Sequence, residues 1–416
     1  MLKDSRLPRP SAYEIADHVR EAMASAGPGL SDGEVLELCR QRVLASPQSV
    51  LLDINEKSKL VRSVFCALRC ELEILHDIAS DPSVTEIMVN GPDDIFIEKD
   101  GRKVRADISF GEPARLGRVI QRIAAGVSRE MNDLNPIVDA RLADGSRINA
   151  VNSNIALGGP ILTIRKFTRN RMTIDELIAQ GGISEEAAEM LRVMVICGFN
   201  IFISGGTSSG KTTFLNVLSD FIPPEERVIV IEDSAELQIR GHENLVRLEA
   251  KQANAQGRGA VSIRELIKAS LRMRPDRIIV GEVRDEAVID MVAAMSTGHD
   301  GSLSTGHANS PEGMLRRLES LYLSGSGMPL AAVRAQIGQA IELFVHLARG
   351  ADGKRRVTEI AELETNADSD IRLNTLFKYD PEKGLVRSGN PVRRREKLRF
   401  RTEGLLYLRS IGEAEA

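Results

Sequence analysis

The feature that most constrains this chain is a glycine-rich segment near its middle. Residues 201–218 read IFISGGTSSGKTTFLNVL, so that Gly205, Gly210, Lys211 and Thr212 match the pattern G-x-x-x-x-G-K-[ST]. A short apolar, β-branched run precedes the glycines, and an amphipathic helical pattern follows them. A strand, a tight loop and a helix in this order form an α/β unit whose loop can hold phosphate groups.

The residue types in this loop indicate a specific ligand. Glycines let backbone N–H groups surround phosphate oxygens, and the amino end of the following helix adds positive potential. Lys211 can reach the β- and γ-phosphates, and Thr212 can ligate Mg²⁺. The sequence therefore predicts ATP and Mg²⁺ as cofactors, bound by the uninterrupted run Gly205, Gly206, Thr207, Ser208, Ser209, Gly210, Lys211, Thr212 and Thr213.

Acidic residues follow a second expected strand, in RVIVIEDSAEL. Glu232 and Asp233 stand at its end, and Glu236 comes a few residues later. The carboxyl ends of parallel strands are where such sheets bind ligands. Glu232 and Glu236 are therefore candidates, with Thr212, for the shell around Mg²⁺, and Glu232 is also a candidate catalytic residue. The acidic first turn of a helix explains the same residues equally well.

A third expected strand, in DRIIVGEVRD, ends in Gly281 and Glu282. Gly281 stands where an Asp linked to Mg²⁺ is the usual residue. We expect Glu282, alone or with Glu232, to polarise the water that attacks the γ-phosphate. An ion pair between Glu282 and Arg284 is the alternative.

Histidines and arginines supply the remaining candidates. The segment STGHDGSLSTGHANS places His299 and His307 among small residues, and a histidine near a γ-phosphate can sense it through a hydrogen bond. Arg147 and Arg165 occur much earlier in the chain, so they can act as cations on a bound nucleotide only if domains or protomers come together. Surface ion pairs are the alternative for both arginines.

The order of the expected elements divides the chain into four parts. Residues 1–70 combine a disordered tail with a helical module, in which apolar residues recur at spacings of three and four. Residues 71–166 read as an α+β domain, and a polar linker follows it. Residues 173–350 alternate strands with helices, which predicts a parallel sheet covered on both faces, and residues 351–416 form a C-terminal extension.

Composition and length narrow the class of protein further. The 416 residues carry a formal net charge of −4, which argues against a protein that coats nucleic acid. Four cysteines without ligand spacing fit reduced thiols better than disulfides or a metal site. The amino end has no apolar leader, and the most apolar stretch, residues 193–203, is shorter than the roughly 20 residues that cross a bilayer. We therefore expect a cytoplasmic protein that meets the membrane only through a partner or a surface.

Several segments together resemble the secretion-ATPase superfamily, which includes the motors of type II secretion, type IV pili and type IV secretion. The resemblance rests on the glycine-rich loop, IEDSAEL, the run RLEAKQANAQGRGAVSIRELIKASLRMRPDRIIVGEVRD and GHDGSLSTGHANSPEGMLRRLE, and it extends over DPSVTEIMVNGPDDIFIE and DARLADGSRINAV. Within the superfamily the chain is most similar to the CpaF-type ATPase of the tight-adherence (Flp) pilus. It lacks the tetracysteine zinc motif that many type II export ATPases carry.

The resemblance implies a RecA-like ATPase domain, a smaller α+β N-domain before it, and a homo-hexamer with nucleotide between the two domains. It also implies a role for each matched position: Glu282 is the catalytic glutamate, Glu232 and Glu236 belong to the Asp box, His307 belongs to the His box, and Arg147 and Arg165 reach the nucleotide.

The function that the resemblance implies is an ATP-hydrolysing motor for pilus assembly or protein export, working at inner-membrane platform proteins and peripheral to that membrane. A type IV secretion or conjugation ATPase and a nucleotide-gated scaffold with little turnover are the alternatives. No nucleic acid is expected as a partner. The basic run RRREKLRFR at residues 393–401 is expected to meet anionic lipid or an acidic platform loop, a solvated tail being the alternative.

Overall fold

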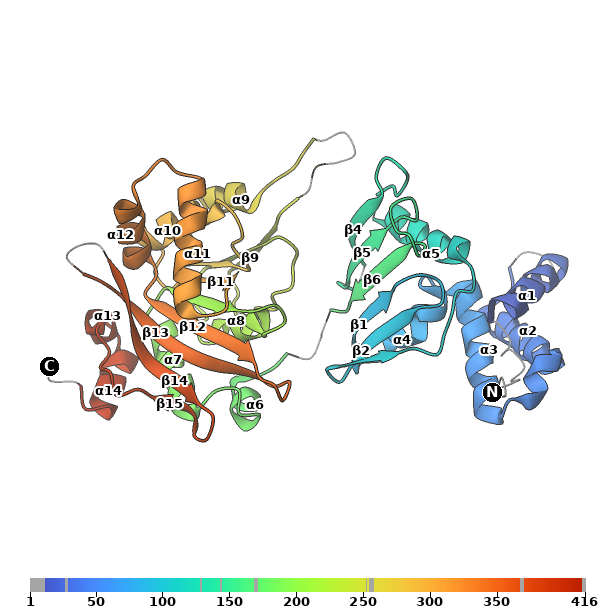
Figure 1. Cartoon of the computed structure of the whole chain (residues 1–416), viewed down its shortest axis with the longest axis horizontal. Coiled ribbons are helices and arrows are strands. Elements are labelled where there is room, and N and C mark those ends of the chain that lie inside the picture. The colour runs from blue at the N-terminus through green and yellow to red at the C-terminus, as the bar shows by residue number, and fades with distance from the viewer. Residues whose placement is uncertain are drawn as a thin grey trace, which may run out of the picture. The chain divides into compact units, whose positions relative to one another are not determined.

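The strands of the chain fall into two separate sheets, with the boundary near residue 170. The computed structural model describes residues 12–26, 29–127, 129–142, 144–167, 171–251, 253, 258–366 and 370–413. They belong to two compact units, Met1–Arg169 and Asn170–Ala416, and each unit has its own sheet (Figure 1). The tail expected before residue 12 and residues 168–170 of the expected linker lie outside the described residues.

The first unit begins with short and medium helices. Capping boxes fix the amino ends of two of them, since Ser31 pairs with Glu34 and Asp53 with Glu56. The helices are α1 (Ala12–Ala26), α2 (Asp32–Ala45), η1 (Pro47–Leu51), α3 (Ile54–Arg69), η2 (Glu73–Leu75) and α4 (His76–Ser80).

A six-stranded antiparallel sheet, in the order β3-β2-β1-β6-β5-β4, and helix α5 (Pro113–Gly126) complete the first unit. Val119 and Ile123 of α5 share a hydrophobic cluster with Ile164 of the sheet, so the helix covers one face of the sheet. The strands are β1 (Val84–Val89), β2 (Ile95–Lys99), β3 (Arg102–Arg105), β4 (Ile137–Arg141), β5 (Arg147–Val151) and β6 (Ile161–Arg165).

The helical module and the sheet share one core. Tyr13, Val35 and Val64, from α1, α2 and α3, belong to the same cluster as the sheet residues. A polar contact reinforces it, because the Tyr13 hydroxyl donates to buried Glu73 at 2.6 Å, and Arg122 of α5 donates to the other carboxylate oxygen at 2.6 Å. A buried carboxylate with two donors is much less costly than an unpaired one, so this contact ties α1 to α5.

The second unit contains a nine-stranded sheet, in the order β15-β14-β13-β12-β7-β11-β10-β8-β9. The six strands from β12 to β9 are parallel, and β13, β14 and β15 add to one edge in antiparallel pairing. The strands are β7 (Ile201–Gly205), β8 (Val228–Glu232), β9 (Leu245–Glu249), β10 (Arg277–Val280), β11 (Leu303–His307), β12 (Leu343–Arg349), β13 (Arg355–Thr365), β14 (Ile371–Asp380) and β15 (Gly384–Arg387).

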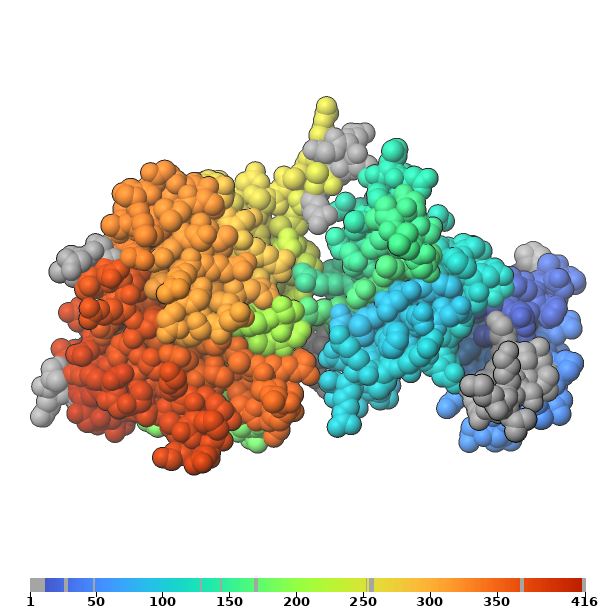
Figure 2. Space-filling view, in the orientation of Figure 1, coloured from blue at the N-terminus to red at the C-terminus, as the bar shows by residue number. Residues whose placement is uncertain are grey.

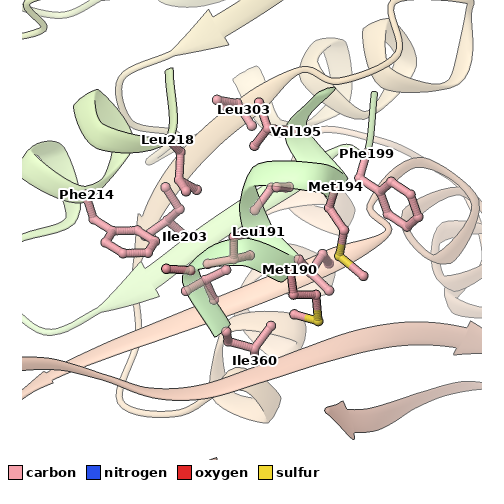
Figure 3. Packing of buried hydrophobic residues seen from close by; sticks show 14 of the residues in the cluster. Met190, Leu191, Met194, Val195, Phe199, Ile203, Phe214, Leu218, Leu303 and Ile360 are labelled. Carbon is pink, nitrogen blue, oxygen red and sulfur yellow. The ribbon is translucent and has the colours of Figure 1, made fainter. Parts of the chain in front are cut away.

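Helices cover both faces of this sheet, as its sequence predicted. Ile203 of β7 packs with α7 and α8 in one hydrophobic cluster (Figure 3), whereas its neighbour Phe202 packs with α10, α11 and α12 in another. Successive strand residues point to opposite faces, so the two clusters lie on opposite sides. The helices are α6 (Ile174–Ala179), α7 (Glu185–Ile196), α8 (Lys211–Ser219), α9 (Ile263–Ser270), α10 (Ala287–Ser296), α11 (Pro311–Ser324), α12 (Leu330–Ala340), α13 (Arg395–Arg399) and α14 (Thr402–Ser410).

The region expected as a C-terminal extension contributes β13, β14 and β15 to the sheet and packs α13 and α14 against the same unit. Its described residues, 351–366 and 370–413, form the red surface of Figure 2. The basic run is paired inside this unit: Arg393 with Glu364, Arg394 with Glu342, Arg395 with Glu413, Lys397 with Glu342 and Asp300, and Arg401 with Glu226. These basic residues therefore have acidic partners within their own unit, and their expected contact with anionic lipid or an acidic platform loop stays a prediction.

Among the helices that the structure describes, none combines the length and the apolar character needed to cross a membrane.

The contact between Tyr13 and Glu73 should control how firmly α1 is held. Removing one buried hydrogen bond to a charged group costs about 1.5–3 kcal/mol, so Tyr13→Phe should let the amides of α1 exchange roughly tenfold faster or more. Hydrogen-exchange mass spectrometry of the full chain measures this. Peptides from α8, in the other unit, are the internal reference, and unchanged exchange in α1 would show that the apolar contacts alone hold that helix.

Candidate functional site

The glycine-rich loop joins the central strand β7 to helix α8, as its spacing predicted. Gly210 has φ +96° and Ser208 has φ +59°, both in the left-handed region, where glycine is favoured. A Cβ on Gly205 would lie 2.5 Å from the Leu347 carbonyl oxygen and 2.5 Å from Ser209 Oγ. The loop therefore requires glycine at both ends. Gly205 has no room for a side chain, and Gly210 has a left-handed backbone conformation.

Lys211 lies inside this loop at the first residue of α8. Its side chain is largely buried, and Nζ donates to the Gly205 carbonyl at 3.1 Å and to the Gly206 carbonyl at 2.9 Å. These contacts keep the ammonium group over the loop opening, where phosphate oxygens can replace the carbonyl partners. Thr212 and Thr213 follow it in the first turn of the helix, half-buried.

His307, the last residue of β11, lies between Lys211 and Glu282, which stands just beyond β10. The His307 ring lies with Nδ1 3.4 Å from Lys211 Nζ and with Nε2 3.1 Å from Glu282 Oε1. The other Glu282 oxygen accepts from Arg284 at 2.8 Å. The structure thus brings three predicted site residues into contact, and it also contains the ion pair with Arg284 that was the alternative for Glu282.

The charges in this cluster shift two pKa values. Burial alone would raise the pKa of Glu282, but the hydrogen bond and charge of Arg284, with the charges of His307 and Lys211, bring it below its usual value. Burial lowers the pKa of His307, the charge of Lys211 lowers it further, and Glu282 only partly opposes them. At neutral pH the site therefore holds an ionised carboxylate beside a neutral imidazole.

Glu232 occupies a different environment at the end of β8. Its Oε1 accepts from the backbone amides of Glu236 and Leu237, each at 2.7 Å, and Oε2 lies 3.5 Å from an Arg247 nitrogen. Burial raises its pKa, although these amides and Arg247 oppose the shift. Its carboxylate shapes the loop after β8, which the acidic pattern alone did not indicate.

A steric contact explains why residue 281 is glycine, and the sequence did not reveal this contact. A Cβ on Gly281 would lie 3.2 Å from Glu232 Cγ, so the side chain from β8 fills the space that a residue after β10 would otherwise use. The carbonyl of Gly281 accepts from Thr305 at 2.7 Å, and the Val283 amide donates to the Thr305 carbonyl at 3.0 Å. These bonds to β11 fix the backbone on both sides of Glu282.

The two histidines that the sequence placed together are separated by β11. His299 precedes the strand and contacts the Ala294 carbonyl near the end of α10, at 3.2 Å. His307 ends the strand, beside Gly205 of β7. The length of a strand lies between them, so only His307 reaches the loop.

Arg147 and Arg165 lie in the first unit, directly opposite each other on β5 and β6. They are on the solvent side of the sheet, since their neighbours Ile148 and Ile164 are buried on the other face. The two side chains therefore form a cationic pair on one surface of the first unit.

The residues of the loop fit a nucleotide with Mg²⁺. The Ser209 hydroxyl is buried without a hydrogen-bond partner among the residues that the structure describes, so it can still donate to, or accept from, a bound group. No group of three or more His, Cys, Asp or Glu side chains in the described ranges could hold a metal by itself. A hard ion here would take Thr212 with phosphate and water oxygens, the arrangement that Mg²⁺ prefers.

One residue beside the loop could not be identified from the sequence. Arg355, at the start of β13, donates from Nε to the Ser208 carbonyl at 3.0 Å. It is 147 positions away in sequence and carries no local pattern, so only the addition of β13 to the sheet reveals it.

This chain is similar in sequence to known proteins over most of its length. The family described as type II/IV secretion system protein matches residues 71–378. A putative conjugal transfer protein of Mycobacterium tuberculosis is 36% identical over 313 residues, which are 74% of this chain and 88% of that protein. The conjugal transfer protein TrbB of Rhizobium radiobacter is 34% identical over 318 residues, which are 76% and 93% of the two chains.

A third relative is similar over a comparable share of the chain, and a solved structure shares its fold. The type IV secretion system protein PtlH homolog of Bordetella bronchiseptica is 31% identical over 315 residues, 70% of this chain and 93% of that protein. The pilus retraction motor PilT with bound ADP matches with a TM-score of 0.51 at 21% identity, covering 73% of this chain and 82% of that one. The likeness confirms the predicted fold, a RecA-like α/β domain after a smaller α+β domain.

The contact between Lys211 and His307 should influence the pKa of His307 and, through it, how the stability of the chain depends on pH. Lys211→Met removes a positive charge, so the pKa of His307 should rise toward its usual value, as measured by NMR titration of the imidazole in the full chain. Because the folded-state pKa of His307 lies below its unfolded value, this group makes the native chain less stable as pH falls from about 6.5, and Lys211→Met should reduce that loss. Lys268→Met, which removes a lysine from α9, is the control and should leave the titration of His307 unchanged.

Proposed function

The chain belongs to the type II/IV secretion system protein family, and from that premise we propose that it is an ATPase that powers a secretion or pilus system. The observation that carries the proposal is the contact of Lys211, His307 and Glu282 at the mouth of the glycine-rich loop. This places a phosphate-binding cation, a polar sensor and a carboxylate within reach of one terminal phosphate.

Each group has a separate task in this proposal. The loop amides and Lys211 bind the phosphates of ATP, and Thr212 holds Mg²⁺, which when bound neutralises charge on the β- and γ-phosphate oxygens. Glu282 orients the attacking water and accepts its proton. His307 lies between Lys211 and Glu282, so it connects the phosphate-binding cation to the carboxylate.

The two carboxylates differ in a way that separates their roles. The pKa of Glu282 is lowered by its cationic neighbours, whereas that of Glu232 is raised by burial. Different surroundings allow two carboxylates to have different tasks. We assign the water-orienting role to Glu282. Glu232 holds the loop after β8 and, with Glu236, borders the Mg²⁺ site through water.

Assembly completes the site in this proposal. Arg147 and Arg165 form a cationic pair on the first unit, which can stabilise the charge that develops on a transferred phosphoryl group once it is brought to the loop. A homo-hexamer, with nucleotide between the first and second units, provides that closure.

The finer function that we propose is assembly of a tight-adherence (Flp) pilus of the kind powered by CpaF-type ATPases, in the cytoplasm at inner-membrane platform proteins. A type IV secretion or conjugation ATPase is supported equally, since two relatives are named conjugal transfer proteins. A nucleotide-gated scaffold with little turnover is the third candidate, and the ionised Glu282 near Lys211 disfavours it. We expect no nucleic-acid binding, and salt-sensitive binding of DNA would favour the conjugation alternative.

Variants of Glu282 and Lys211 should affect ATP hydrolysis and ATP binding differently. Glu282→Gln removes the proton acceptor, so ATP turnover should fall by about 100-fold or more while nucleotide affinity changes little. Lys211→Ala should weaken nucleotide binding itself. The measurements are phosphate release and the Kd of ATP. Glu286→Gln, at an exposed glutamate nearby, is the matched control, and wild-type turnover in Glu282→Gln would overturn the assignment.

The arginine pair should matter for turnover and not for folding of the second unit. We expect Arg147→Ala combined with Arg165→Ala to reduce ATP turnover by roughly 10³-fold, the lower end for a cation supplied from outside the phosphate site. Arg102→Ala, on edge strand β3, is the control.

Residues 171–416 alone should fold and hydrolyse ATP poorly. A fully active fragment would make both arginines ordinary surface residues.

A further inference from the structure

Arg355 lies across the outside of the glycine-rich loop. Its Nε donates to the Ser208 carbonyl at 3.0 Å, and Ser208 is the non-glycine residue of the loop in the left-handed region. A Cβ built on Gly210 would lie 3.3 Å from Arg355 Cδ. The aliphatic part of Arg355 therefore packs on one end of the loop while its guanidinium group binds the backbone nearby.

The guanidinium group has capacity left after this contact. Nε makes the one hydrogen bond of the side chain to described residues, so the Nη1 and Nη2 groups are unused within the described part of the chain, and the side chain is exposed. Its neighbour Arg356 shows the usual arrangement, since it pairs with Asp352 and lies over the Tyr379 ring. Arg355 thus lies beside a phosphate-binding loop without a carboxylate partner among the described residues.

The position of Arg355 indicates which phosphates it can meet. Loops of this pattern surround the α- and β-phosphates with their backbone amides, and Lys211 serves the β- and γ-phosphates from inside the loop. Arg355 approaches the same loop from the β13 side, at Ser208 and Gly210. A planar guanidinium group can hold a carbonyl with its Nε–H and phosphate oxygens with its terminal N–H groups in one fixed geometry, whereas an ammonium group is a compact charge without that planar fork.

We propose that Arg355 is a nucleotide-binding residue, which holds the loop through Ser208 and donates its terminal N–H groups to the α- and β-phosphates of a bound nucleoside diphosphate or triphosphate. This inference rests on the proposed function, because it requires a nucleotide in the loop. ADP and ATP share these phosphates, so Arg355 contributes to the affinity of both, unlike a residue that senses the γ-phosphate.

The test compares ADP binding by the full chain and three variants, using calorimetry or a fluorescent ADP. Loss of hydrogen bonds to a charged group predicts a Kd for ADP about tenfold higher or more in Arg355→Ala, with a similar change for a non-hydrolysable ATP analogue. Arg355→Lys keeps the charge but loses the planar fork, so it should recover only part of the affinity. Arg356→Ala perturbs the same strand without reaching the loop, and it should bind ADP as the wild-type chain does.

A second readout separates phosphate contact from a purely structural role. If Arg355 contacts phosphate, its loss should also make the Kd for ADP less sensitive to salt concentration, because one ionic contact is gone. A weaker Kd with unchanged salt dependence, or an equal loss in Arg356→Ala, would assign Arg355 to loop structure and overturn the inference. Wild-type affinity in Arg355→Ala would overturn it as well. A wild-type chain that binds no ADP would instead remove the proposed function itself.

Discussion

The left-handed turn that carries β7 into α8 is the constraint on which the rest of the site depends. Gly205 can be nothing larger because the Leu347 carbonyl and Ser209 leave no room, and Gly210 must adopt φ +96° for α8 to begin at Lys211. Since β7 lies between β11 and β12 in a parallel sheet, the groups that end the neighbouring strands reach the same edge. For that reason His307 contacts both Lys211 and Glu282, and β13 brings Arg355 to the other side of the loop.

The pKa values of the acidic residues follow from the groups that this arrangement brings close together. Lys211, Arg284 and His307 surround one half-buried carboxylate, Glu282, and together they outweigh the effect of burial on its pKa. Glu232, deeper in the unit, is stabilised by two backbone amides and Arg247, which do not fully offset its burial. Two glutamates that follow similar strands in the sequence therefore have different roles. Glu282 faces the phosphate-binding loop, and Glu232 stabilises the loop after β8.

Much of the fold could be predicted from local pattern. The strand expected at residues 277–280 is β10 (Arg277–Val280), and the phosphate-binding loop stands between a strand and a helix as its spacing required. Long-range features could not be predicted. Residues after 350 were expected only as an extension, yet they extend the sheet through β13, β14 and β15. Antiparallel edge strands need no helical crossover, so the alternation of strands and helices that indicated the rest of the sheet stops before them. The acidic partners of the basic run could not be predicted either, because they lie up to 175 positions away, as in Arg401 with Glu226.

The sequence by itself determined the loop, its ligand class and the acidic and histidine candidates, since backbone conformation at a glycine and the reach of a lysine are local properties. Only the tertiary structure decided which candidates meet. It separated His299 from His307 by the length of β11, gave Glu232 to the backbone amides of Glu236 and Leu237, and explained Gly281 by the side chain packed against it. These outcomes depend on strand order and on which face a side chain takes, and both are set by packing between segments far apart in the chain.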